Sequence, residues 1–312
     1  AFHLAPCMHA SANTQRHPTG LPSTLPPDWP VYRLHTPQGD TAIVSQHGAQ
    51  VLSWRTADGT ERLFLSPAIN WQDVARQRCA IRGGIPICWP QFNRRGKLPK
   101  HGFARLLPWT LVKQNAHSLH LRLRHTDVPP AWLHDAQGNA LWPHAFETSV
   151  HITLVHNALT LRLHVSNTGQ SALSFTTALH GYLAGPAIRH CAIHGAHGQT
   201  YWDAVPHANP THPVQYGPIG FSGEVDRVYP AFTATLTDNH APTLCSRQSP
   251  TLEQTVVWNP GAKLCTQLAD LQADSYQRFV CVEAAHIDTS VSLPPGAVWQ
   301  GWQMFQAFRA HE

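Results

Sequence analysis

Three stretches of the chain alternate strictly between apolar and polar residues, and this pattern limits the possible folds more than any other feature. The stretches are 119–123, 150–154 and 159–165, where Leu, Ile or Val fills every second position. Such alternation is typical of β-strands that have one buried and one polar face. His156-Asn157 separates the last two stretches and predicts a tight turn. The pattern therefore indicates an antiparallel meander.

The rest of the chain also favours strands. Proline occurs at 26 positions, which argues against long helices, and Asp58-Gly59 between two apolar runs predicts a hairpin turn. Further strands are expected at 41–45, 49–54, 172–179, 187–193, 253–258, 278–284 and 297–308. We predict an all-β fold, a large antiparallel β-sandwich of two packed sheets with few short helices.

The domain organisation follows from the absence of any linker-like composition after the first residues. Residues 1–27 are rich in Pro, Ser, Thr and Ala without a period and predict an extended N-terminal arm. No low-complexity segment divides the remainder, so 28–312 is expected to be a single β-sandwich domain.

Charge and cysteine content narrow the class of protein. The net charge is +4 with no basic run, so no nucleic-acid partner is expected, whereas small anionic substrates are compatible. The seven cysteines form no Cys-x-x-Cys pair and predict reduced thiols. No apolar run reaches the ~20 residues of a spanning helix, and no signal peptide is evident. We expect a cytoplasmic protein with no membrane partner, as a monomer or weak dimer.

An irregular segment at 81–105 contains several candidate ligand-binding residues close together in the sequence. Arg82 precedes Gly83-Gly84, which we expect to let backbone amides approach a ligand, and Arg105 follows His101-Gly-Phe-Ala. Arginine suits bidentate contacts to phosphate. Taken alone, however, the two arginines are more readily explained as surface or ion-paired residues.

Two further residues are candidates for acid and base chemistry. His180 ends an apolar strand before Gly181, and its ordinary pKa suits proton transfer near neutral pH. With 23 histidines in the chain, an ordinary structural role is the competing interpretation. Glu283 lies within an apolar, β-prone run, where a carboxylate is costly unless it is paired or functional. Glu283 is therefore the best candidate for a general base, with a structural carboxylate as the alternative.

The remaining candidates are weaker. Asp226 lies in a polar cluster that could equally be a turn with a capping aspartate. Trp89 and Phe92 could form an apolar platform for a sugar, although tryptophan is more often core. Histidine pairs such as His194 and His197 lack partners at recognisable ligand spacing, so neither a metal nor another cofactor is expected.

Five blocks of the sequence, taken together and in order, resemble the glucose-6-phosphate 1-epimerase family, the hexose-6-phosphate mutarotases. The blocks are Arg-Gly-Gly-Ile-Pro-Ile-Cys-Trp-Pro (82–90), His-Gly-Phe-Ala-Arg (101–105), Ala-Leu-His (178–180), Glu-Val-Asp-Arg-Val-Tyr (224–229) and Val-Glu-Ala-Ala (282–285). The resemblance implies a galactose-mutarotase-like β-sandwich. It also implies interconversion of the α and β anomers of hexose 6-phosphates, with glucose 6-phosphate as the expected substrate.

The resemblance also implies roles for individual residues. It makes His180 the catalytic acid and Glu283 the catalytic base, with Arg82 and Arg105 binding the phosphate. His101 and Asp226 fall at further substrate-contacting positions.

One position departs from the family pattern. Lys100 stands where relatives often have a substrate-contacting glutamine, so the contact with substrate would differ here. Two other functions stay open: an epimerase of neutral aldoses, and a non-catalytic sugar-phosphate-binding protein. The paired arginines argue against the first, and the acid–base pair argues against the second.

Overall fold

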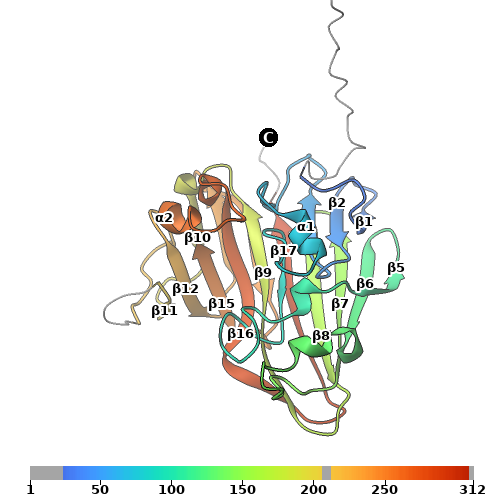
Figure 1. Ribbon diagram of the computed structural model, residues 1–312. Coiled ribbons are helices and arrows are strands. Elements are labelled where there is room, and N and C mark those ends of the chain that lie inside the picture. The colour runs from blue at the N-terminus through green and yellow to red at the C-terminus, as the bar shows by residue number, and fades with distance from the viewer. Residues whose placement is uncertain (1–23, 206–211, 309–312) are drawn as a thin grey trace, which may run out of the picture.

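The computed structural model describes residues 24–205 and 212–308, which form three antiparallel β-sheets and only short helices (Figure 1). This confirms the all-β prediction and the prediction of few short helices. The α-helices of the described residues are α1 (Trp71–Ala75) and α2 (Gly261–Cys265). Short 3₁₀ turns lie at Ala104–Leu106, His125–Asp127, Pro130–Trp132, Ile188–His190 and Ser275–Gln277.

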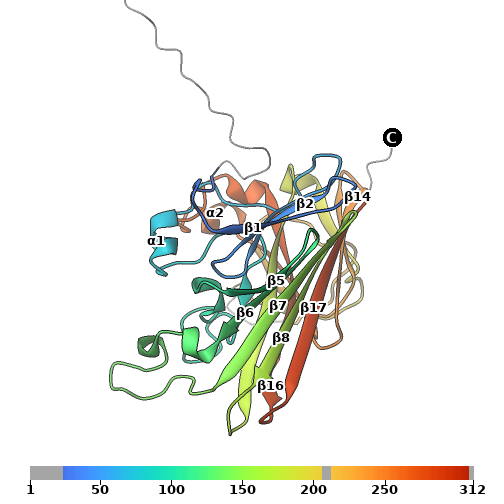
Figure 2. The same cartoon turned by 90° about the vertical axis from the view of Figure 1, so that its right-hand side faces the viewer.

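The largest sheet has eight strands in the order β10-β13-β14-β17-β8-β7-β6-β5. Their bounds are β5 Thr110–Gln114, β6 Ser118–Arg124, β7 Phe146–Val155, β8 Ala158–Asn167, β10 Cys191–His194, β13 Ala234–Asp238, β14 Ala241–Gln248 and β17 Val298–Ala307. The strands β6, β7 and β8 are the meander predicted from the alternating stretches, and Figure 2 shows them side by side.

The second sheet has six strands in the order β11-β12-β15-β16-β9-β4. Their bounds are β4 Ile87–Cys88, β9 Leu173–Ala184, β11 Trp202–Asp203, β12 Val225–Pro230, β15 Gln254–Asn259 and β16 Phe279–Leu293. The strand expected at 187–193 begins only at Cys191, because the chain first turns at Gly185-Pro186 and then forms a 3₁₀ turn. The arm predicted for residues 1–27 lies, as far as residue 23, outside the described residues.

A third, small sheet was not predicted. It contains β1 (Val31–His35), β2 (Thr41–Ser45) and β3 (Val51–Arg55), and it lies at the upper end of the molecule in both views (Figures 1 and 2). These strands are joined by short turns, so each pairs with its sequence neighbour rather than with a large sheet. The single-domain interpretation of 28–312 remains a prediction.

The six-stranded sheet has one face in the core and one face that carries polar groups. Alternate residues of its central strands, such as Val257, Val282 and Leu179, join the main hydrophobic cluster together with leucines of β6 and β8. The intervening residues point the other way, since side chains alternate along a strand. Glu283 and His180 belong to this second set, which is therefore the place where a functional site can form.

Candidate active site

Glu283 and His180 meet across two neighbouring strands. They are direct partners in the register of β16 and β9, and Glu283 Oε1 lies 3.2 Å from His180 Nε2. Both side chains are almost fully buried, with exposed fractions of 2% and 10%. The His180 backbone N–H donates to the Pro86 carbonyl oxygen at 2.9 Å, which ties this strand to the irregular segment. The two candidates thus form one buried pair.

Burial changes the pKa of both members of this pair. It raises the pKa of the Glu283 carboxyl well above its usual value, with the nearby charge of Asp226 as the second cause. It lowers the pKa of the His180 imidazole well below 6.5, and the positive charges of Arg82 and Arg105 lower that pKa further. The resting pair is therefore a neutral imidazole beside a carboxyl group that holds its proton readily.

Arg82 is held in place on two sides. Its Nε donates to Asp270 Oδ2 at 2.9 Å and its Nη1 donates to the Tyr182 hydroxyl at 3.0 Å. Tyr182 follows His180 by two residues on β9, so both side chains lie on the same face, and their rings stack 4.8 Å apart. This arrangement fixes the arginine beside the histidine.

Close packing requires the glycine pair after Arg82. Gly83 and Gly84 both have positive φ, +114° and +60°. A Cβ on Gly83 would collide with the Phe64 carbonyl oxygen, and one on Gly84 with that of Val51. The Gly84 N–H donates to the Phe64 carbonyl oxygen at 2.7 Å, so this amide is not free for a ligand, contrary to our expectation.

Arg105 and Lys100 add further positive charge beside Arg82. Arg105 Nη2 donates to the Lys100 carbonyl oxygen at 2.9 Å. Its buried Nε has no hydrogen-bond partner among the described residues. Burial lowers the pKa of Arg105. Partial burial is the main cause that lowers the pKa of Lys100, and the positive charges of Arg82 and Arg105 lower it further. Positive charges that lie this close together favour the binding of an anion.

His101 has a defined tautomer. Its Nδ1 accepts a hydrogen bond from the Asn93 backbone N–H at 3.2 Å, so the proton of the neutral ring is on Nε2. Burial is the main cause that lowers the pKa of His101 well below 6.5, and the positive charge of Arg105 is the second cause. The ring is therefore neutral at pH 7. The ring lies 5.7 Å from that of His180. His101 can thus donate one hydrogen bond beside the acid–base pair.

Two further acidic groups, Asp226 and Glu224, lie on the Glu283 side of the site. Burial is the main cause that raises the pKa of Asp226 to about 6, and the negative charge of Glu224 is the second cause. Burial also raises the pKa of Glu224, with Asp203 as the second cause. These carboxylates can accept hydrogen bonds from the hydroxyl groups of a polar ligand.

The candidate residues line one cleft with two adjoining chambers. The first, of about 190 Å³, contains Glu283, Asp226 and Glu224. The second, of about 340 Å³, contains Arg105 and Asp270. Arg82, Lys100, His101 and His180 line both chambers. The structure therefore brings together all of the predicted site residues except Trp89.

Trp89 lies in the hydrophobic core and not in the cleft. Its side chain is fully buried and packs against Phe103, Trp142 and Phe146. The platform predicted for Trp89 is therefore wrong, because Trp89 points toward the aromatic core. Phe92, predicted with it, does line the first chamber.

Aromatic walls of the cleft come from residues that the sequence analysis did not select. Tyr182 stacks on His180, and Trp258 contacts the same ring edge-on at 6.0 Å. The two-residue spacing from His180 could have identified Tyr182. Trp258 is opposite Asp226 in the register of β15 and β12, which only the structure reveals.

Other sequence expectations concern metals, cysteines and membranes. In residues 24–205 and 212–308, no group of three or more His, Cys, Asp or Glu side chains is arranged to hold a metal ion. The cysteines of these ranges are all free thiols. A helix with the length and apolar content to span a membrane is absent from the same ranges.

Comparisons with known proteins agree with the fold and show the family. The family model described as aldose 1-epimerase matches residues 30–306. A protein of Cenchrus ciliaris, provisionally named glucose-6-phosphate 1-epimerase, is 31% identical over 279 residues, covering 83% of this chain and 79% of its own. An Escherichia coli K12 protein with the same provisional name is 31% identical over 251 residues, covering 78% of this chain and 79% of its own.

Solved structures give the same result. The crystal structure of a provisionally named mutarotase from Salmonella typhimurium has a TM-score of 0.73 and 25% identity, covering 90% of each chain. The Slr1438 protein from Synechocystis has a TM-score of 0.70 and 20% identity, covering 92% of this chain and 98% of its own, and it supports the fold alone. The family match and the relatives above 30% identity show that the chain belongs to the aldose 1-epimerase family.

Proposed function

We propose that this protein interconverts the α and β anomers of hexose 6-phosphates, with glucose 6-phosphate as the main substrate. One observation carries the proposal: His180 lines both chambers, whereas Glu283 lines only the first and Arg105 lines only the second, which we call the cationic chamber. In a hexose 6-phosphate, the ring oxygen lies between the phosphate-bearing arm and C1. The order Arg105, His180, Glu283 from the second chamber to the first therefore matches the order phosphate, O5, C1 along the sugar.

The chemistry follows from this alignment. Glu283 accepts the proton of the C1 hydroxyl, and His180 donates a proton to O5 as the C1–O5 bond breaks. The open aldehyde then rotates about C1–C2, and ring closure on the other face reverses both proton transfers. His101, protonated on Nε2, donates a hydrogen bond to the ring oxygen or to a neighbouring hydroxyl. Asp226 accepts hydrogen bonds from hydroxyls at the far end of the first chamber.

The phosphate itself would prepare the acid. The resting imidazole is neutral, whereas the reaction needs it protonated, and Arg82 and Arg105 contribute to its low pKa. A phosphate monoester carries about −1.5 to −2 charge at pH 7. Once it pairs with these arginines, their effect on His180 is offset and the pKa of the imidazole rises. The proton shared with Glu283 then moves toward His180, which leaves the carboxylate as the base.

The neutral-aldose alternative is less consistent with the cleft. A neutral sugar has no group that needs Arg82, Arg105 and Lys100, whereas a phosphate uses all three. Binding at this remote group also helps to hold C1 and O5 against the catalytic pair.

Magnetisation-transfer NMR of anomer exchange tests the proposal, with glucose 6-phosphate and free glucose measured in parallel. We expect rapid exchange between the anomers of glucose 6-phosphate and little acceleration with glucose. Equal acceleration of both sugars would favour a general aldose epimerase. Exchange of glucose 6-phosphate no faster than in buffer would contradict the proposed activity.

A further inference from the structure

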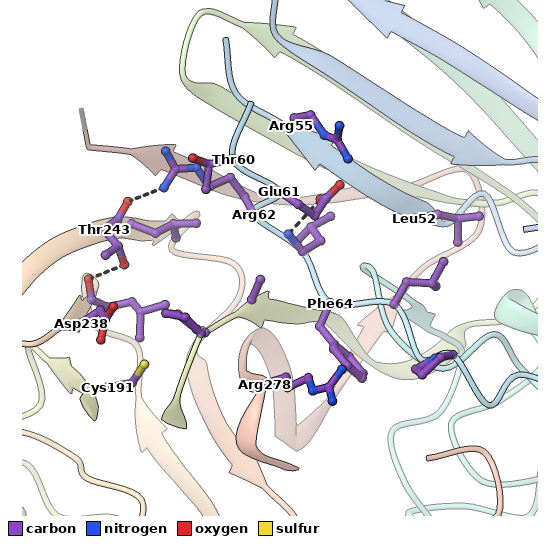
Figure 3. Close-up of a pocket in the computed structure, with 18 of the residues that line it drawn as sticks. Leu52, Arg55, Thr60, Glu61, Arg62, Phe64, Cys191, Asp238, Thr243 and Arg278 are labelled. Atoms are coloured by element: carbon purple, nitrogen blue, oxygen red, sulfur yellow. Dashed lines mark hydrogen bonds between the residues drawn. The ribbon is translucent and has the colours of Figure 1, made fainter. Parts of the chain in front are cut away.

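A second cavity, of about 860 Å³, lies outside the candidate cleft and shares no lining residue with it (Figure 3). Its walls come from the end of β3 and the segment after it, the end of β9, and the β13–β14 hairpin. About half of the wall residues are apolar, among them Leu52, Phe64, Leu65, Pro186, Leu236 and Leu244. A cavity of this size and lining is typical of sites for small organic molecules.

Backbone hydrogen bonds hold the wall of this cavity in place. The Phe64 N–H donates to the Tyr182 carbonyl oxygen at 2.9 Å, and the Ala184 N–H donates to the Arg62 carbonyl oxygen at 3.0 Å. Phe64 also stacks on Phe279 with ring centroids 4.7 Å apart. The cavity is therefore preformed, which lowers the cost of binding a ligand.

Most charged groups of the lining already have partners within the protein. Glu61 accepts hydrogen bonds from the backbone N–H groups of Trp54 (2.9 Å) and Leu63 (3.1 Å) and from the Ser53 hydroxyl. Burial raises the pKa of Glu61, and the positive charge of Arg55 acts in the opposite direction. The arginines at 62 and 278 form ion pairs with Asp58 at 3.3 Å and Asp274 at 2.6 Å, respectively.

Arg55 differs from these two arginines. Its side chain is exposed, and although the charge of Glu61 acts on it over a longer distance, it forms no ion pair with any residue in the described part of the chain. Figure 3 shows Arg55 and Arg278 at opposite edges of the lining, with Phe64 between them. The cavity thus combines an apolar interior with an exposed guanidinium that has no ion-pair partner within 4 Å in the described part of the chain and can pair with an anion.

We propose that this cavity binds a second ligand, an apolar molecule with a single anionic head group, whose apolar part contacts Leu52, Phe64 and Leu244 and whose head group pairs with Arg55. The site is independent of the epimerase reaction, because no residue of the catalytic cleft takes part in it.

The test uses 8-anilinonaphthalene-1-sulfonate, an apolar fluorophore with one sulfonate, titrated into the full-length protein. We expect saturable binding to one site that excess glucose 6-phosphate does not displace. Ala184 is half-buried and faces the cavity, so Ala184→Phe should fill it and weaken binding by about tenfold or more. Ala192→Phe is the matched control, since Ala192 is also half-buried but does not line the cavity.

Arg55→Gln tests the head-group contact without filling the cavity. We expect it to weaken binding several-fold, whereas Arg33→Gln, on the exposed side of β1, should have no effect. Absence of saturable binding, displacement by glucose 6-phosphate, or full affinity in both Ala184→Phe and Arg55→Gln would overturn the proposal. Since the readout is fluorescence, it is independent of whether the protein is an epimerase.

Discussion

Glu283 and His180 face each other directly across β16 and β9, with 3.2 Å between the carboxyl oxygen and the imidazole nitrogen. Both groups are buried, and their pKa values move in opposite directions, each toward favouring the uncharged form of its group. This pairing gives the site one readily exchanged proton. A reaction that removes one proton and delivers another at neighbouring atoms needs such a pair.

Replacement of the base should abolish turnover without abolishing binding. In Glu283→Gln the side chain keeps its shape but cannot accept the C1 hydroxyl proton. We expect kcat for glucose 6-phosphate to fall by about 10³-fold, while the dissociation constant, measured by calorimetry, stays within a few-fold. Glu253→Gln, at an exposed glutamate, is the control and should behave like the unaltered protein. Near-normal turnover in Glu283→Gln would remove Glu283 from the mechanism.

Asp270 should act on substrate binding through Arg82. Its carboxylate accepts from Arg82 Nε at 2.9 Å, so Asp270→Asn should weaken the positioning of the guanidinium. We expect KM for glucose 6-phosphate to rise about 3–10-fold with a smaller change in kcat, as for the loss of one charge-assisted hydrogen bond.

A matched control exists for this change. Asp274→Asn breaks the ion pair with Arg278, which is about half exposed and lies outside the cleft, and KM should not change. If Asp270→Asn lowered kcat but left KM unaltered, Asp270 would not position Arg82 for phosphate binding.

Much of the fold could be predicted because alternation is a local property. The leucines at 119, 121 and 123 predict one strand and its buried face without knowledge of any other residue, and β6 confirms them. The small sheet of β1 to β3 was missed as a separate unit, because pairing partners depend on contacts that a local pattern does not contain.

The site was predictable to a different degree for different residues. Glu283 could be recognised because a carboxylate in an apolar strand is costly, and it is indeed buried. Trp89 could not be placed, since a tryptophan suits a sugar platform and a core equally well. Asp270 and Trp258 reach the cleft only through tertiary contacts, with Arg82 and with His180, so no sequence spacing connects them to it.

The pKa of His180 should respond to an anion in the cationic chamber. In the free protein it lies well below 6.5, so the imidazole is neutral at pH 7. Inorganic phosphate bound to Arg82 and Arg105 should raise this pKa, because it offsets the positive charges that disfavour protonation. The imidazole ¹⁵N chemical shifts, titrated against pH with and without phosphate, measure the change.

His47 is the internal control for this titration. Burial alone lowers its pKa to about 4, and it lines neither chamber of the cleft, so phosphate should leave its titration unaltered. A titration of His180 that did not move with phosphate would contradict the idea that the substrate prepares its own acid.

Gly83 should be far more sensitive to substitution than another glycine of similar backbone conformation. Gly83 and Gly59 both have positive φ, +114° and +84°, so alanine is strained at either position. A Cβ at Gly83 would also collide with the Phe64 carbonyl oxygen, whereas a Cβ at Gly59 would meet no atom within 4 Å. We expect Gly59→Ala to lower the free energy of unfolding by about 1 kcal/mol and Gly83→Ala by about 3 kcal/mol or more. Urea unfolding of the two variants measures the difference. Equal losses would show that the close packing of the segment after Arg82 against Phe64 does not contribute to stability.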